Sequence, residues 1–202
     1  MSYGNTFALW RIAAGGIWRD YTHHAFVEGM RDGTLSRDAF LRYLVQDYLF
    51  LVHFSRAWAL AVTKAETLEE MRVCAATVHA LLNEEMRLHV GTCAAEGISE
   101  AELFAAREAS QNLAYTRYVL DAGHSGDFLD LMAALAPCVL GYGEIGARLA
   151  SEAEQTPYAE WIATYSGADY QRSCREVGAL IDAAVARRLG AAPEDSPRWP
   201  GL

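Results

Sequence analysis

Long apolar runs, basic charge and closely paired cysteines are all scarce in this sequence of 202 residues. Charged residues interrupt the hydrophobic stretches, so we expect none to reach the roughly 20 residues that a membrane-spanning helix needs. The 17 basic and 26 acidic residues give a net charge of −9, which opposes attraction to phosphate backbones and anionic membranes. We therefore expect neither a nucleic-acid partner nor a membrane partner.

The cysteines are few and far apart. Cys74, Cys93, Cys138 and Cys174 form no C-x-x-C pair and are too sparse for a disulfide scaffold in a chain of this length. The first 16 residues hold one cation, Arg11, and lack a charged segment followed by a long apolar one, so a secretory signal is not expected. The pattern predicts reduced thiols and a cytoplasmic protein.

The overall composition is that of a packed globular protein. Hydrophobic residues make up 52% and charged residues 21%, and glycine and proline are limited to 16 and 5 residues. No repeat, low-complexity tract or interdomain linker is evident, and the length matches the prior for one domain. We predict a single domain over residues 1–202.

Helix start and stop signals recur along the chain, and no segment shows the strict alternation of a strand-rich fold. Ser36 is placed to cap a helix that runs towards Lys64. The pattern predicts an all-α, multi-helix bundle of about eight helices, including a first helix or helix pair from about residue 6 to 30 and one helix from 110 to 122. Further starts are predicted at two capping boxes, Thr67 with Glu70 and Ser99 with Glu102, and after Asp127 and Thr156, with a stop at Gly190.

Asp47 is the most informative single residue. An ionised carboxylate among apolar neighbours needs a cation, hydrogen-bond donors or a ligand with an amino group, because burying it alone costs several kcal/mol. The alternative is an aspartate that is satisfied internally or lies at the helix edge. Its same-face helical neighbours are all apolar or aromatic: Phe40, Tyr43, Leu44, Phe50, Leu51 and Phe54.

Cys138 follows Pro137 inside a stretch with a helical pattern. The proline lacks an N–H and frees the carbonyl one turn earlier, at Ala133, so the helix should loosen where the thiol lies. Tyr142 follows one turn later. The interpretations are a nucleophilic thiol or a small residue that only packs, and sequence alone leaves both open.

Polar-tipped aromatic residues recur on two predicted helices. Trp161 and Tyr165 lie four residues apart, and Tyr115 and Tyr118 lie three apart. Such side chains are suited to stacking on a ligand ring or bonding to it, and core packing is the alternative.

Metal ligation is weighed on Glu84, Glu85 and His89, which share one predicted helix. Di-iron sites in helical bundles need two Glu-x-x-His pairs and further acids. The sequence contains no Glu-x-x-His. We therefore expect no metal at the site.

Four segments together resemble the TenA family, the thiaminase II or aminopyrimidine aminohydrolase proteins of thiamin salvage. The likeness extends from about Trp18 to Arg187. The segments are Asp32-Gly33-Thr34-Leu35 leading into Phe40–Tyr48, then His53-Phe54-Ser55-Arg56, then Pro137-Cys138 with Gly141–Gly146, and Tyr158–Tyr165.

The resemblance implies a haem-oxygenase-like bundle without haem, assembled as a homotetramer, with a buried pocket and no metal or organic cofactor. It implies a hydrolase that replaces the amine of 4-amino-5-aminomethyl-2-methylpyrimidine by hydroxyl and, in many members, also cleaves thiamin. Residue by residue, it places the pocket acid at Asp47 and the catalytic nucleophile at Cys138. Tyr142, Tyr115 and Tyr165 match positions where the family places tyrosines around the pyrimidine.

Two positions depart from the family pattern. Phe50 stands where a pocket tyrosine is usual, which keeps the ring and loses a hydroxyl that could tune substrate choice. The family's general acid is a glutamate near the start of a final helix, and this sequence reaches Leu202 before any such segment. We therefore expect residues 1–202 to lack that final helix, with Trp199 and Leu202 in its lead-in; the alternatives are a native chain that is longer and a protein that lacks this acid.

Three functional hypotheses follow. The first is an aminopyrimidine hydrolase of thiamin salvage that acts through Cys138 and Asp47. The second is a non-catalytic aminopyrimidine-binding or regulatory protein on the same scaffold. The third is a different enzyme of the same superfamily, a metal-dependent oxidase or one that acts on another amine, motivated by Glu84, Glu85, Glu144 and His89.

Overall fold

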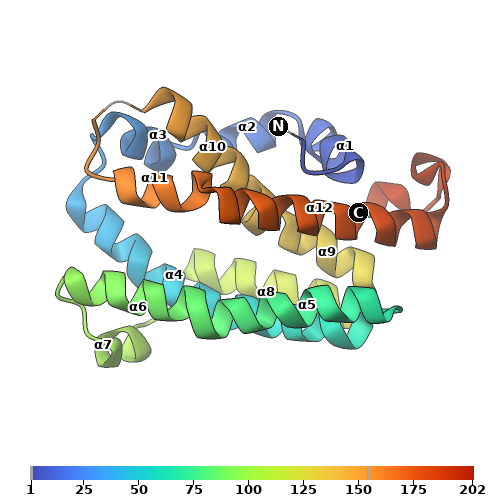
Figure 1. Cartoon of the computed structure of the whole chain (residues 1–202), viewed down its shortest axis with the longest axis horizontal. Coiled ribbons are helices and arrows are strands. Elements are labelled where there is room, and N and C mark those ends of the chain that lie inside the picture. Colours follow the sequence, from blue (N-terminus) through green and yellow to red (C-terminus); the bar gives the residue numbers. More distant parts are fainter. Residues whose placement is uncertain (1, 154) are drawn as a thin grey trace. The chain divides into compact units, whose positions relative to one another are not determined.

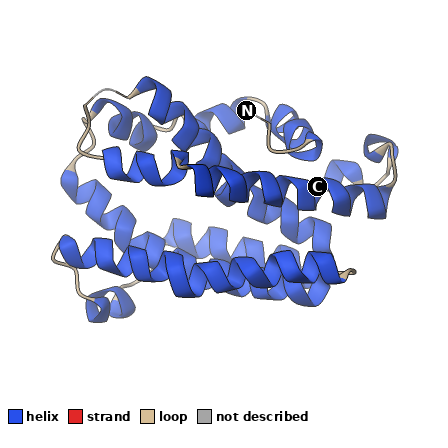
Figure 2. Ribbon diagram, in the orientation of Figure 1, coloured by secondary structure: helices blue, strands red, loops and turns tan. Residues whose placement is uncertain are grey.

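The computed structural model describes residues 2–153 and 155–202, and this part of the chain is all-α (Figure 2). The absence of strands in the described residues confirms the predicted fold class. The chain divides into two compact units, unit 1 over residues 1–35 and 135–202 and unit 2 over residues 36–134. The single domain over residues 1–202 stays a prediction.

Unit 1 combines the two ends of the chain. Its core holds the buried side chains of Phe7, Met30, Leu140, Leu149 and Ile181. The long helix α12 contacts α1, α10 and α11. The elements, labelled where there is room in Figure 1, are α1 (Asn5–Ala14), α2 (Gly16–Thr22), α3 (Ala25–Asp32), the π-helix η2 (Pro137–Gly141), α10 (Tyr142–Glu152), α11 (Ala159–Ser166), α12 (Ala168–Leu189), and the 3₁₀ turns η3 (Pro193–Asp195) and η4 (Trp199–Gly201).

Unit 2 is organised around α4 (Arg37–Lys64), which contacts α5, α6, α7 and α8. Its core includes the fully buried side chains of Trp58, Leu103 and Leu131. The other elements are α5 (Leu68–Ala80), the π-helix η1 (Leu81–Glu85), α6 (Met86–Ala95), α7 (Glu100–Ala105), α8 (Ser110–Ser125) and α9 (Phe128–Ala136), whose last two residues belong to unit 1.

The predicted caps define several helix starts. The Ser36 side chain accepts a hydrogen bond from the Ala39 N–H at the start of α4, and Ser99 with Glu102 forms the complete capping box of α7. Thr67 caps α5 as predicted, but the Glu70 carboxylate accepts from the Glu66 N–H rather than from Thr67. Thr67 therefore caps α5, but Thr67 and Glu70 do not form the predicted capping box.

Two predictions about helix boundaries were wrong. The described residues form twelve α-helices rather than about eight, because the π-helices interrupt long helices and the N-terminal stretch turns twice. One turn lies at Gly15, whose φ of 52° favours glycine. The last-but-one helix begins at Ala159 instead of Pro157, because the Thr156 hydroxyl donates to the Met30 carbonyl and accepts from the Tyr158 N–H in a turn before the helix.

The expectation of no long apolar segment also needs correction. The helical segment Phe128–Glu152 is long and apolar enough to span a membrane by length and composition alone. Most of its apolar window, 67%, is buried inside the structure. A buried core helix passes the same test, so this one segment is weak evidence for a membrane span.

Candidate functional site

Asp47 lies on α4 inside the predicted apolar wall of unit 2. Its side chain is 10% exposed, and Leu44 and Leu51 on the same helix face are buried. The Tyr43 hydroxyl donates to Oδ2 of Asp47 at 3.4 Å. Nδ1 of His89, from α6, lies 3.5 Å from the same oxygen. The carboxyl is thus held by a phenol and an imidazole rather than by Lys or Arg.

Burial controls the protonation of this carboxyl. It raises the pKa of Asp47 to about 7, and the Tyr43 hydrogen bond only partly offsets it. Burial and the charge of Asp47 together raise the pKa of Glu85 to about 7. Burial, with Asp47 again contributing, raises the pKa of the Cys93 thiol to about 11. Two carboxyl groups of unit 2 can therefore stay neutral near neutral pH.

The contacts of His89 show that both of its ring nitrogens face groups of α4. Nε2 lies 2.7 Å from the Leu44 carbonyl oxygen, which only accepts, so this nitrogen carries a hydrogen. In a neutral ring Nδ1 is then an acceptor that faces Asp47. Burial lowers the pKa of His89, which favours the neutral ring. A neutral Asp47 is a suitable hydrogen-bond donor to it.

Phe50 and Tyr115 form an aromatic face in the same unit. Their rings are stacked, with centroids 6.2 Å apart and planes 13° apart, and Phe50 also stacks on Phe54 at 5.1 Å. The Tyr115 hydroxyl donates to the Ala134 carbonyl at 3.0 Å. The Tyr115 hydroxyl hydrogen is thus engaged within unit 2 while its ring packs on Phe50.

Cys138 lies in η2 of unit 1. The helix ahead of it gives way at Pro137 to a π-helical turn that ends at Gly141, so the predicted loosening takes the form of a π-helix. Cys138 is partly buried, whereas Cys74, Cys93 and Cys174 are fully buried. Cys138 is therefore the most exposed of these thiols.

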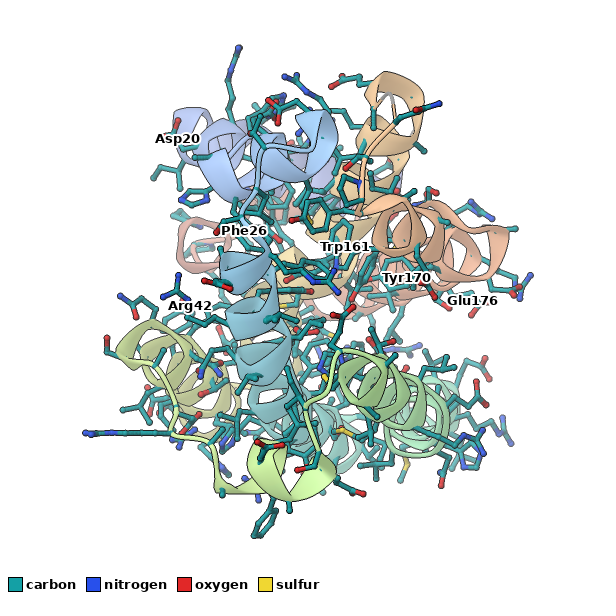
Figure 3. All side chains as sticks on the ribbon, turned by 90° about the vertical axis from the view of Figure 1, so that its left-hand side faces the viewer. Asp20, Phe26, Arg42, Trp161, Tyr170 and Glu176 are labelled. Atoms are coloured by element: carbon teal, nitrogen blue, oxygen red, sulfur yellow. The ribbon has the colours of Figure 1, made fainter. Side chains whose placement is uncertain are left out.

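Tyr142 and Tyr165 belong to an aromatic cluster of α10, α11 and α12. The Tyr165 ring centroid lies 5.1 Å from that of Tyr142, 4.4 Å from Trp161 and 4.9 Å from Tyr170. Figure 3 labels Trp161 on α11 and Tyr170 on α12. Tyr118, in contrast, is 64% exposed on α8 of unit 2, so it lies outside the buried aromatic groups.

Gln171 is a buried residue that the sequence did not single out. Its Nε2 donates to the carbonyls of Gly143 and Tyr165, each at 2.9 Å, and its Oε1 accepts from the Tyr3 hydroxyl at 2.7 Å. These bonds tie α12 to the end of α11 and to the start of α10. A glutamine on a helix carries no local signal of such a role.

The structure groups the predicted site residues by unit. Asp47, Phe50 and Tyr115 lie in unit 2, and Cys138, Tyr142 and Tyr165 lie in unit 1. Their roles stay predictions.

One of the acidic residues that suggested a metal site, Glu144, has other partners. Glu144 accepts from Arg11 at 2.9 Å and from the Trp18 indole at 3.3 Å. Within residues 2–153 and 155–202, no three His, Cys, Asp or Glu side chains gather in a way that could hold a metal ion.

Several proteins of known sequence or structure are similar to this chain. The chain is 38% identical over 158 residues, 77% of this chain and 70% of the relative, to an aminopyrimidine aminohydrolase of Halalkalibacterium halodurans. It is 40% identical over 162 residues, 79% of this chain and 75% of the relative, to an uncharacterized protein of Haemophilus influenzae. A solved structure from Silicibacter sp. TM1040, described as a TenA family transcription regulator, matches with a TM-score of 0.97 and 62% identity, over 98% of this chain and 88% of that one. The model of the TENA/THI-4/PQQC family matches residues 11–194, so the chain belongs to this family.

Proposed function

We propose that this protein is an aminopyrimidine aminohydrolase of thiamin salvage. The observation that carries the proposal is the 38% identity to a relative of that name across 77% of this chain. The substrate we expect is 4-amino-5-aminomethyl-2-methylpyrimidine, and the products are hydroxymethylpyrimidine and ammonia. Thiamin is a second substrate to test, with cleavage between its pyrimidine and thiazole rings.

In this proposal Cys138 is the nucleophile. Its thiolate adds to a ring carbon, and the electron pair that it supplies passes through the ring and expels the exocyclic amine, which leaves as ammonia after taking up a proton. Water then adds to the exocyclic methylene, loses a proton and becomes the hydroxyl. The thiolate departs from the ring and is regenerated. The partial exposure of Cys138 among otherwise fully buried thiols supports this choice.

Asp47 is the proposed partner of the aminopyrimidine edge. A carboxyl with a pKa of about 7 is present in both neutral and ionised forms near neutral pH, so it can donate to a ring nitrogen or accept from an amino group. The rings of Phe50, Tyr115, Tyr142 and Tyr165 are the proposed stacking and hydrogen-bonding faces.

A non-catalytic regulatory role is the weaker interpretation. The net charge of −9 disfavours direct DNA binding. A regulator that only binds the pyrimidine would not need an accessible thiol, so turnover separates the two functions.

The proposed assembly is a homotetramer, and the proposed location is the cytoplasm. An exposed apolar stripe runs along α5 into η1 at spacings of three and four residues, which suits packing against another helix. The four free cysteines suit a reducing compartment. The stripe consists of Leu68, Met71, Ala75, Val78 and Leu82, of which Val78 is partly buried.

The test of the function is turnover by the purified chain. Incubation with the aminomethylpyrimidine should release ammonia and hydroxymethylpyrimidine in equal amounts. Chromatography and mass spectrometry measure the pyrimidine product. The same pyrimidine without the 5-aminomethyl group serves as a control and should release nothing. Tight pyrimidine binding without any ammonia would favour the binding protein instead.

A further inference from the structure

The π-helix that carries Cys138 receives hydrogen bonds from side chains of two other helices. The Tyr21 hydroxyl, from α2, donates to the Pro137 carbonyl at 3.0 Å. The Tyr170 hydroxyl, from α12, donates to the Val139 carbonyl at 3.2 Å and lies 3.5 Å from the Cys138 carbonyl. Three consecutive carbonyls, those of residues 137, 138 and 139, thus face phenol groups.

Gly141 allows the approach of Tyr21. A Cβ atom at this position would lie 2.7 Å from Cε1 and 3.0 Å from the hydroxyl oxygen of Tyr21, closer than side chains pack. The Tyr21 ring therefore lies against the backbone of η2 at Gly141, while its hydroxyl reaches Pro137 one turn earlier. This contact depends on a residue without a side chain.

A third group supports η2 from α12. The Cys174 thiol lies 3.4 Å from the Val139 carbonyl and is fully buried. Burial raises the pKa of Cys174 to about 12, so this thiol keeps its hydrogen and can donate it. Carbonyls of a π-helical turn thus have side-chain partners on the flanks of Cys138.

We propose that Tyr21 and Tyr170 are positioning residues that hold η2 in its π-helical form and so fix the direction of the Cys138 thiol. A π-helical turn is an unfavourable local conformation that needs support from its surroundings. The Tyr21 bond fixes the backbone just before Cys138, and the Tyr170 bond fixes it just after. Without them the turn is free to shift, and a shift of about 1 Å in a catalytic group can cost on the order of 100-fold in rate. The catalytic part of this inference rests on the proposed function, whereas the placement of the thiol does not.

The test combines alkylation with kinetics in the full chain. Tyr21→Phe and Tyr170→Phe keep the rings and remove only the hydroxyl groups. Tyr158→Phe is the matched control, because the Tyr158 hydroxyl donates to the Leu35 carbonyl at 2.6 Å, an acceptor in the same unit that lies outside η2. Iodoacetamide labelling, read peptide by peptide, gives the rate for each cysteine in one sample.

We expect Cys138 to label about fivefold faster in each η2 variant, the factor that corresponds to one neutral hydrogen bond of about 1 kcal/mol. We expect kcat to fall by about tenfold with KM changed less than about twofold, because the substrate contacts remain while the nucleophile moves. Gly141→Ala, which displaces Tyr21 without altering it, should repeat the effects of Tyr21→Phe. Tyr158→Phe should match the wild type in both measurements.

Two results would overturn the proposal. One is wild-type labelling of Cys138 and wild-type kcat in both tyrosine variants. The other is faster labelling of Cys74, Cys93 and Cys174 together with Cys138, which would mean that the whole unit loosens rather than η2. If the wild type shows no turnover, the proposed function fails, and the ratio of labelling rates still decides the positioning role.

Discussion

Oδ2 of Asp47 lies 3.5 Å from Nδ1 of His89, whose other ring nitrogen donates to the Leu44 carbonyl. Leu44 and Asp47 lie three residues apart on α4, so one face of this helix fixes both nitrogens of a ring from α6. The arrangement orients the imidazole towards the carboxyl and favours a neutral pair near neutral pH. Whether Asp47 donates or accepts a hydrogen bond depends on the proton of its carboxyl group.

The first prediction concerns pH. Because the pKa of Asp47 is raised to about 7 in the native protein, the native state keeps a proton that the unfolded chain loses near pH 4. Between about pH 4 and 7 the native state therefore binds more protons than the unfolded chain. The contribution of Asp47 to stability declines over this range and is lost as pH rises through about 7. Burial lowers the pKa of His89 from its usual value of 6.5. Below that value the unfolded chain binds more protons at this residue, so the contribution of His89 to stability grows as pH rises.

We expect Asp47→Asn to lessen the decline of the free energy of unfolding between pH 5 and 8, measured by urea denaturation. A profile for Asp47→Asn that runs parallel to the wild type would contradict the raised pKa.

The second prediction separates the ring of Tyr115 from its hydroxyl. The hydroxyl donates to the Ala134 carbonyl, so Tyr115→Phe should destabilise the fold by about 1 kcal/mol and leave KM within about threefold. Tyr115→Ala removes the stack on Phe50 and should raise KM by about tenfold or more, since aromatic stacking contributes about 1 kcal/mol beyond area burial. Equal KM values for the two variants would show that the ring does not contact the substrate.

The third prediction concerns Gln171, whose amide makes three buried hydrogen bonds. Gln171→Ala leaves the Tyr3 hydroxyl and two carbonyls without this partner, so we expect a loss of about 2–4 kcal/mol in the free energy of unfolding. Gln171→Glu should also destabilise, because a carboxylate cannot donate to the Gly143 and Tyr165 carbonyls. Chemical denaturation at pH 8 measures both, and a loss below about 0.5 kcal/mol would contradict a structural network here.

The fourth prediction tests the proposed assembly. Leu68 and Met71 of the α5 stripe are 68% and 38% exposed, and burying such side chains between chains contributes about 1.5–3 kcal/mol each. The double variant Leu68→Lys with Met71→Lys should convert a tetramer of 22.2 kDa chains into smaller species in light scattering. Phe104→Lys, which changes an exposed residue on α7, serves as the control and should leave the mass unchanged. A wild-type monomer would refute the tetramer.

Local patterns predicted those features that depend on residues close in sequence. The helical spacing around Asp47 predicted its apolar wall, and the buried Leu44 and Leu51 confirm it. Pro137 predicted a disturbed helix at Cys138, because a missing N–H acts within one turn. The π-helical form of that turn did not follow, since it depends on which groups meet the carbonyls.

Features that join distant residues escaped prediction. His89 reaches Leu44 across 45 positions, Tyr21 reaches Pro137 across 116, and Gln171 reaches Tyr3 across 168. Nothing in the local sequence specifies such pairs, because tertiary packing decides which helix faces meet. Glu70 is a local exception, because the sequence placed its carboxylate in a capping box with Thr67, whereas it accepts from the Glu66 N–H four residues earlier.

The central claim, hydrolysis through Cys138, is tested most directly by turnover of the aminomethylpyrimidine in ¹⁸O-labelled water. The account predicts hydroxymethylpyrimidine with one ¹⁸O in its hydroxyl, and a rate reduced by at least about 100-fold in Cys138→Ser, while Cys74→Ala, at a buried thiol in α5, retains turnover. Product without ¹⁸O, no product, or a Cys138→Ser variant as active as the wild type would contradict it.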